Sequence, residues 1–393
     1  ALRDQARDLA GHVARNPGLE LDDAARALAR RTRFEHGAAV VAADRGALLG
    51  ALNAVATGDP HPDVLVPDMP GPEPAEGGGK TVFVFPGQGP QWPGMGRDLA
   101  AASPVFARHL HDCAEAFAPY LDYDLLDLLT TDTPLDTPRH VQPALFAMMV
   151  SLARTWQHAG ITPDAVIGHS QGEIAAAHIA GALTLTDAAR IITHRTATLA
   201  AITGRGAMAS LNLPHDHAAA LLPPTVSIAA ANSPRTTVVS GDPDAIARLV
   251  DTCTRQGIHA RTIPVDYASH SPHIDPLRHQ LLTALHDITP APADIPFYST
   301  VTADRLDTTQ LTARYWYDNL RNPVQFTQTI TTLTHTGHTR YIETSPHPVL
   351  TTPIHETHHH TTTIPTLHRN KHTPTQLLHA LTHAHLTGLT VHW

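Results

Sequence analysis

Cysteine is scarce in this sequence, which has only Cys113 and Cys253, far apart in the chain. Two distant cysteines build neither a disulfide framework nor a thiolate metal site. No stretch approaches the roughly 18 apolar residues of a membrane span, and no basic segment leads into an apolar one at the N-terminus. We therefore expect a protein of a reducing cytoplasm without a membrane segment. The abrupt start ALRDQ is typical of a fragment of a longer chain.

Charge of one sign is not concentrated anywhere in the chain. The formal net charge is −9, and short alternations of acidic and basic residues leave no basic stripe that would attract a phosphate backbone. This pattern argues against nucleic acid as a partner. Because 42% of the 393 residues are hydrophobic, the chain can bury sizeable cores, and we expect two or three packed units.

The first 75 residues predict a small α/β unit. It would comprise a helix with apolar residues at helical spacing (Leu2, Ala6, Leu9 and Val13), a second helix opening at Asp22, the strand AAVVAA and a helix capped by Asp44. The stretch 66–80, VPDMPGPEPAEGGGK, has too little apolar content to pack and is typical of a linker.

The middle of the chain predicts an α/β sheet with an insertion. TVFVFPGQG at 81–89 and PDAVIGHSQGEIAAAHIAG at 163–181 each run from an apolar strand into a glycine turn. Residues 206–266 follow the order βαββαβ, which indicates a ferredoxin-like subdomain. The predicted fold class is thus α/β, with an α/β-hydrolase-like core at 80–205 and 267–365. Residues 366–393 would form a structured tail with leucines close to helical spacing.

Ser170 is the main candidate for chemistry. Gly168-His169-Ser170-Gln171-Gly172 fits G-x-S-x-G, in which the serine lies on a strained turn between a strand and a helix and its hydroxyl is exposed. Short glycine–serine turns also occur without chemistry. The apolar strand before this turn and the alanine-rich helix after it favour a nucleophile.

A serine nucleophile needs a base, and the chain contains 30 histidines. His270, in VDYASHSPH, follows the last predicted strand of the insertion, where the chain returns to the main sheet. His273 is its nearest rival. The alternative for either histidine is that it lies on the surface and is not the base. Spacing alone leaves this choice open.

His355-Glu356-Thr357-His358-His359 matches H-E-x-x-H, a zinc pattern that works only when one helix places both histidines on one face. Pro353 before it and TTTIP after it argue against such a helix. We expect a surface loop and no metal site.

Six motifs occur in the order found in acyltransferase domains of modular type I polyketide synthases, and over 80–365 the chain resembles such a domain. They are FPGQG at 85–89, QPALFA at 142–147, GHSQGE at 168–173, YASHS at 267–271, NPVQF at 322–326 and SPHPVL at 345–350. Residues 1–75 are similar to the linker between ketosynthase and acyltransferase, and 366–393 to the segment that follows the acyltransferase.

The resemblance implies a role for each matched residue. Ser170 would be the nucleophile and His270 its general base and acid, oriented by a backbone carbonyl at Asn319 rather than by a carboxylate. The backbone N–H groups of Gln88 and Gln171 would form the oxyanion hole. Arg195, which by pattern alone is more typical of a solvated helix face, would bind the free carboxylate of the substrate.

The resemblance also implies the reaction, a transfer of an extender unit from acyl-CoA through acyl-Ser170 to the phosphopantetheine thiol of an acyl carrier protein. The enzyme itself would need no cofactor, and a ketosynthase would be its neighbour in the same polypeptide. Tyr267, Ala268 and Ser269 in YASH, with Gln171, resemble methylmalonyl-selective domains, with malonyl or ethylmalonyl as alternatives. A serine hydrolase or thioesterase, and a non-catalytic scaffold that only docks a carrier protein, are the other interpretations.

Overall fold

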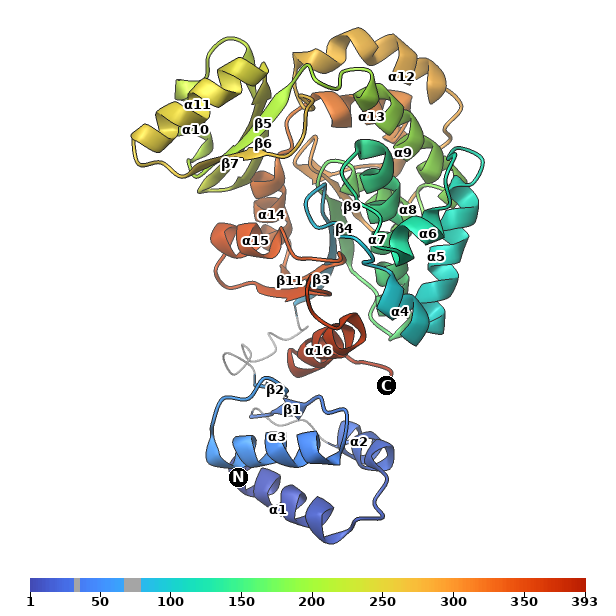
Figure 1. Cartoon of the computed structure of the whole chain (residues 1–393), viewed down its shortest axis with the longest axis vertical. Helices are drawn as coiled ribbons and strands as arrows, with labels where there is room; N and C mark the ends of the chain where they lie inside the picture. Colours follow the sequence, from blue (N-terminus) through green and yellow to red (C-terminus); the bar gives the residue numbers. More distant parts are fainter. Residues whose placement is uncertain (32–35, 67–78) are drawn as a thin grey trace. The chain divides into compact units, whose positions relative to one another are not determined.

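The computed structural model describes residues 1–31, 36–66 and 79–393, which form two compact units (Figure 1). The first contains the described part of 1–79, with 156–161 and 371–393. The second contains 80–155 and 162–370. The predicted linker, apart from its ends, and the predicted boundary at residue 75 lie outside the described residues.

The first unit has the predicted N-terminal elements. Ala6, Ala10 and Val13 form the buried side of its first helix, and the Asp44 side chain accepts a 2.8 Å hydrogen bond from Ala47 N. The two short strands pair antiparallel. Its elements are α1 (Leu2–Arg15), α2 (Leu21–Ala29), β1 (Ala39–Val40), α3 (Arg45–Thr57), β2 (Val64–Leu65) and α16 (Thr373–Leu386).

The second unit is built on a six-stranded sheet in the order β10-β9-β4-β3-β11-β12. Neighbouring strands run parallel, except the antiparallel pair of β9 and β10. The TVFVF stretch is buried from Val82 to Phe85, as expected of a parallel strand covered on both faces. The strands are β3 (Lys80–Phe85), β4 (Ala165–Gly168), β9 (Phe297–Ser299), β10 (Asp304–Arg305), β11 (His338–Glu343) and β12 (Thr362–Pro365).

Helices cover both faces of this sheet. Figure 1 shows α5, α7, α8 and α9 on one side of β3 and β4, and α14 and α15 on the other. The helices are α4 (Arg97–Ala102), α5 (Pro104–Phe117), α6 (Leu125–Thr130), α7 (Pro138–His158), α8 (Gly172–Ile179), α9 (Leu185–Ala200), α12 (Arg278–Ala284), α13 (Ala313–Arg321), α14 (Phe326–His335) and α15 (Thr351–Thr357), with 3-10 turns η1 (Pro272–Leu277) and η2 (Thr308–Gln310).

Residues 206–266 form a separate four-stranded sheet within the second unit. The chain order is β5 (Ala207–Leu211), α10 (His215–Leu221), β6 (Val226–Ser233), β7 (Thr236–Gly241), α11 (Pro243–Arg255) and β8 (Ala260–Ile263). This is the predicted βαββαβ succession, and the strands pair antiparallel in the order β6-β7-β5-β8. Figure 1 shows α10 and α11 beside this sheet.

Two apolar cores fix the small sheet. Ala209, Leu211 and Val239 pack with Ile246 and Leu249 of α11. A second core joins other residues of the small sheet to the main sheet and to α14; it includes Met208, Ala230, Val238, Val82, Ile167, Phe326 and Ile330. This core therefore holds the small sheet against the main sheet.

Helices long and apolar enough to cross a bilayer do not occur in the described parts of the chain.

Candidate active site

Ser170 lies on a tight turn between β4 and α8. Its φ angle is 56°, in the left-handed region that non-glycine residues rarely adopt. A Cβ atom at Gly168 would lie 2.1 Å from Glu173 N, and one at Gly172 would lie 2.0 Å from Phe85 O. Only glycine fits at either position, so the strained turn depends on both flanking glycines.

His270 is the histidine that reaches this serine. Its Nε2 atom lies 2.8 Å from Ser170 Oγ, and its ring is buried. His270 also has a positive φ of 57°. The rival His273 lies 3.2 Å from Asp242 instead. Of the two histidines that the sequence left open, the structure brings His270 to Ser170.

The carbonyl that orients His270 belongs to Asn322. His270 Nδ1 lies 2.8 Å from Asn322 O, so the prediction of Asn319 is wrong. Asn319 lies inside α13, where carbonyl groups follow the helix axis. Asn322 is the C-cap of that helix with an extended backbone (φ −91°, ψ 157°), which frees its carbonyl from the helix direction. An N–H at Nδ1 leaves Nε2 as the proton acceptor for Ser170.

Burial keeps this base neutral. Desolvation, with a smaller contribution from the nearby Arg195 charge, lowers the pKa of His270 to about 3. At neutral pH the imidazole is therefore unprotonated, and Nε2 can accept a hydrogen bond from Ser170 Oγ.

The loop after β3 lies against the Ser170 turn. β3 and β4 pair in register from Val82 and Ala165 to Phe85 and Gly168. A Cβ at Gly87 would lie 3.3 Å from His169 O and 3.8 Å from Ser170 Cβ.

The backbone N–H groups of Gln88 and Gln171 have no acceptor in residues 1–31, 36–66 and 79–393. The N–H of Gln171 directly follows the nucleophile and that of Gln88 follows Gly87, so both are candidates for an oxyanion hole.

Arg195 of α9 is buried at this site. Its side chain is 4% exposed, which rejects the solvated helix face that its pattern alone favoured. Nη2 donates to Ser170 Oγ and Nη1 donates to Asn319 Oδ1, both at 2.8 Å. Burial lowers the pKa of Arg195 to about 10, so the guanidinium stays charged at neutral pH. A cation thus contacts the nucleophile directly.

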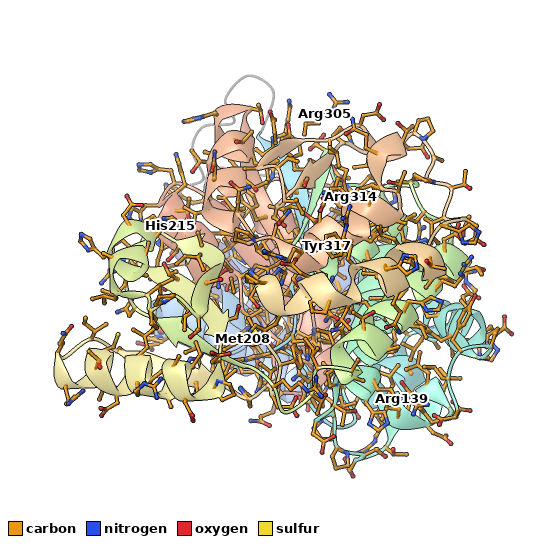
Figure 2. All side chains as sticks on the ribbon, turned by 90° about the horizontal axis from the view of Figure 1, so that it is seen from above. Arg139, Met208, His215, Arg305, Arg314 and Tyr317 are labelled. Carbon is orange, nitrogen blue, oxygen red and sulfur yellow. The ribbon has the colours of Figure 1, made fainter. Side chains whose placement is uncertain are left out.

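Tyr267, Ala268 and Ser269 are buried in the segment that leads to His270. Ser269 Oγ lies 3.4 Å from the sulfur of Met208 on β5, which is labelled in Figure 2. The hydroxyl of Tyr267 donates to Gln88 Oε1, so this segment is tied to the loop after β3.

Glu173, the last residue of the motif GHSQGE, and the side chain of Asn319 are functional candidates to which the sequence assigned no role. Glu173 Oε2 accepts hydrogen bonds from Tyr315 OH at 2.6 Å and from Asn319 Nδ2 at 2.8 Å. The available signal is a carboxylate in the first turn of the helix GEIAAAHI, whose one other polar side chain is His178. Such a carboxylate is buried only when several donors surround it.

The segment around His355 is a helix rather than the expected loop, because Pro353 fits within the first turn of α15. The helix ends at Thr357, before His359, so the two histidines of the zinc pattern do not share one helix. Glu356 accepts a 2.6 Å hydrogen bond from Ser233. Across the described ranges, no cluster of three His, Cys, Asp or Glu residues suited to a metal ion occurs.

Comparisons with known proteins agree with this geometry. Residues 82–391 match the acyl transferase domain family. Polyketide synthase GfsA of Streptomyces halstedii is 45% identical over 410 residues, which cover 100% of this chain and 5% of that protein. The chain therefore spans only a small part of such a relative.

Two solved structures are also similar. The acyltransferase domain from module 8 of the salinomycin polyketide synthase has a TM-score of 0.93 and 44% identity, covering 99% of this chain and 94% of that one. The malonyl CoA-acyl carrier protein transacylase of Coxiella burnetii has a TM-score of 0.70 and 27% identity, and the match covers 78% of this chain and 98% of that one. With a serine, a histidine and an arginine joined at the turn after β4, the chain belongs to the acyltransferase domain family of modular polyketide synthases.

Proposed function

We propose that this chain transfers a dicarboxylic extender unit, methylmalonyl, from CoA to the phosphopantetheine thiol of an acyl carrier protein through an ester of Ser170. One observation carries this proposal: Ser170 Oγ lies 2.8 Å from His270 Nε2 and 2.8 Å from Arg195 Nη2. The nucleophile stands between a base and a cation that can hold the free carboxylate of the substrate.

In the first half-reaction, His270 Nε2 takes the Ser170 proton as Oγ attacks the thioester carbonyl. The oxyanion of the tetrahedral intermediate accepts hydrogen bonds from the N–H groups of Gln88 and Gln171. When the C–S bond breaks, the imidazolium returns its proton to the thiolate of CoA. The Asn322 carbonyl stabilises the imidazolium meanwhile through Nδ1–H.

In the second half-reaction, the carrier thiol gives its proton to His270 and attacks the ester. The C–O bond breaks and Ser170 Oγ recovers the proton. The similar transacylase of Coxiella burnetii is named for the same kind of transfer, from CoA to an acyl carrier protein. A ketosynthase in the same polypeptide is the neighbour we propose, since GfsA, of which this chain matches 5%, is a polyketide synthase.

The geometry at His270 favours transfer over hydrolysis by a serine esterase. Such esterases supply an acidic residue to the histidine and need no arginine at the nucleophile. Here the histidine is oriented by a carbonyl, and the buried carboxylate of Glu173 is bonded to Thr300, Tyr315 and Asn319 instead.

The methylmalonyl preference rests on Ser269, the residue before His270. A small side chain leaves room for an α-methyl group that a phenylalanine would fill. One methylene in a pocket is worth only ~1–3 kcal/mol, so malonyl and ethylmalonyl are the competitors to test.

The test is a competition among malonyl-, methylmalonyl-, ethylmalonyl- and propionyl-CoA at equal concentrations, followed by addition of a carrier protein bearing phosphopantetheine. We expect predominant methylmalonyl loading, and transfer to the carrier faster than release of the free acid. Predominant malonyl loading would contradict the extender unit, and release without transfer would contradict the acyltransferase assignment.

A further inference from the structure

A chain of hydrogen bonds leads from Arg195 into the interior of the protein through one amide. Arg195 Nη1 donates to Asn319 Oδ1 at 2.8 Å, and Asn319 Nδ2 donates to Glu173 Oε2 at 2.8 Å. The three residues are 4%, 2% and 0% exposed, respectively. The amide of Asn319 therefore separates a buried cation from a buried carboxylate.

Four hydrogen-bond donors surround the side chain of Glu173. Its Oε1 accepts hydrogen bonds from Thr300 N at 2.5 Å and Thr300 Oγ1 at 2.7 Å, and its Oε2 accepts one from Tyr315 OH at 2.6 Å. Desolvation raises the pKa of Glu173, and these donors oppose that effect because they favour the ionised form. Since Arg195 can only donate, Asn319 must direct Oδ1 toward it, which leaves Nδ2 to donate to Glu173.

The same arrangement leaves Arg195 without a carboxylate in direct contact. No Asp or Glu oxygen forms an ion pair with it within 4.0 Å in the described part of the chain. Its Nη2 points to Ser170 Oγ, the atom that would carry the acyl group, and its buried Nε has no partner among the described residues. A buried arginine without a contacting carboxylate has a charge that no carboxylate balances directly and a donor without an acceptor. An incoming carboxylate can supply both.

We propose that Asn319 is a specificity-determining positioning residue that keeps Glu173 one amide away from Arg195. The interior carboxylate holds the guanidinium in place, while the spacer leaves the cation free for the carboxylate of a dicarboxylic acyl thioester. A carboxylate at position 319 would pair with Arg195 directly and compete with the substrate. This inference rests on the proposed function, because it concerns how the same site selects its acyl group.

The decisive variant exchanges the two chemical groups, as the double substitution Glu173→Gln with Asn319→Asp. Each change is nearly isosteric, and the formal charge of the pair stays the same. The amide oxygen introduced at position 173 can still accept from Thr300, and the new NH₂ group can donate to the new carboxylate. Tyr315 OH can turn its proton toward Ser299 Oγ, 2.6 Å away. What changes is that the negative charge moves into contact with Arg195.

The measurement is kcat/KM for acylation with methylmalonyl-CoA divided by kcat/KM with propionyl-CoA. We expect this ratio to fall about tenfold or more in the exchanged variant, the scale of a lost charge-assisted hydrogen bond. The change should lie mainly in the KM for methylmalonyl-CoA. A merely structural defect would instead lower kcat/KM for both substrates by the same factor and leave the ratio unchanged. Asn319 Nδ2 also lies 3.2 Å from Ser170 O, so a ratio is a better readout than an absolute rate.

Tyr315→Phe is the matched control. It removes one hydrogen bond to Glu173 but keeps the charge and the orientation of Asn319, so we expect a ratio within about twofold of the wild type. If the exchanged variant does not fold, Asn319→Asp alone gives the same test, because the two neighbouring carboxylates would share a proton and still present an oxygen to Arg195.

The outcomes are distinguishable. A folded exchanged variant that keeps the wild-type ratio overturns this inference and leaves the proposed function intact. A wild-type enzyme that shows no preference for methylmalonyl over propionyl contradicts the proposed function, and the inference with it.

Discussion

Arg195→Lys removes one half of a two-pronged contact while it keeps the positive charge. In the structure Nη1 donates to Asn319 and Nη2 donates to Ser170 Oγ, both at 2.8 Å. A lysine offers one nitrogen for these two positions and cannot form two parallel bonds with a carboxylate. A hydrogen bond to a charged group is worth about 1.5–3 kcal/mol, so the preference for dicarboxylic over monocarboxylic acyl groups should fall roughly 10- to 150-fold.

The assay is a competition between methylmalonyl-CoA and propionyl-CoA, scored by intact mass of the acyl-enzyme. Arg195→Ala should show the larger loss, and acetyl- or propionyl-CoA should then compete. Arg190→Lys is the matched control, because Arg190 lies on the same helix but pairs at the surface with Asp287. We expect that control to retain the wild-type preference. If Arg195→Lys and Arg195→Ala both retain the wild-type preference for dicarboxylic acyl groups, another group binds the carboxylate and our account of the site is wrong.

Three further predictions concern the turn, the base and the pocket. Gly172→Ala should abolish acylation and lower thermal stability, since its Cβ would lie 2.0 Å from Phe85 O; unchanged activity would refute the constraint on the turn. Because burial lowers the pKa of His270 to about 3, kcat/KM for acylation should show no break near pH 6.5, and a kinetic break at that pH would show an exposed base. The free energy of unfolding that this group contributes should be present above pH 6.5 and should fall as the pH drops toward 3. Ser269→Phe should shift loading toward malonyl, because the ring would occupy the space beside Met208, and an unchanged extender profile would remove Ser269 from the specificity pocket.

Local patterns predicted much of the fold. The helix with apolar residues at Ala6 and Val13, the cap at Asp44 and the βαββαβ succession at 206–266 all appear in the structure. Each depends on residues close together in the chain, where periodicity and capping are decisive. The Ser170 turn belongs to the same class, since its glycines and its strand and helix are adjacent in sequence.

The remaining parts of the site depend on contacts distant in sequence. No local pattern distinguishes a buried Arg195 from a solvated helix face, because its burial and its bond to Asn319 involve residues far away in the sequence. The predicted residue Asn319 lies three residues before Asn322, whose carbonyl orients His270, because a motif fixes a segment but not which carbonyl leaves a helix at its end. Glu173 needed donors from Thr300 and Tyr315, more than 120 residues away in the chain, and only the folded structure brings them together.

The central claim is that Ser170 carries the acyl group. The most direct measurement is peptide mapping by mass spectrometry after brief exposure to methylmalonyl-CoA, with the wild type and Ser170→Ala compared. The account predicts one methylmalonyl group on the peptide that contains Ser170, its loss when a carrier protein with a free phosphopantetheine thiol is added, and a folded, unlabelled Ser170→Ala variant. Labelling of Ser170→Ala at the wild-type level, or an acyl group mapped to another residue, would contradict the account.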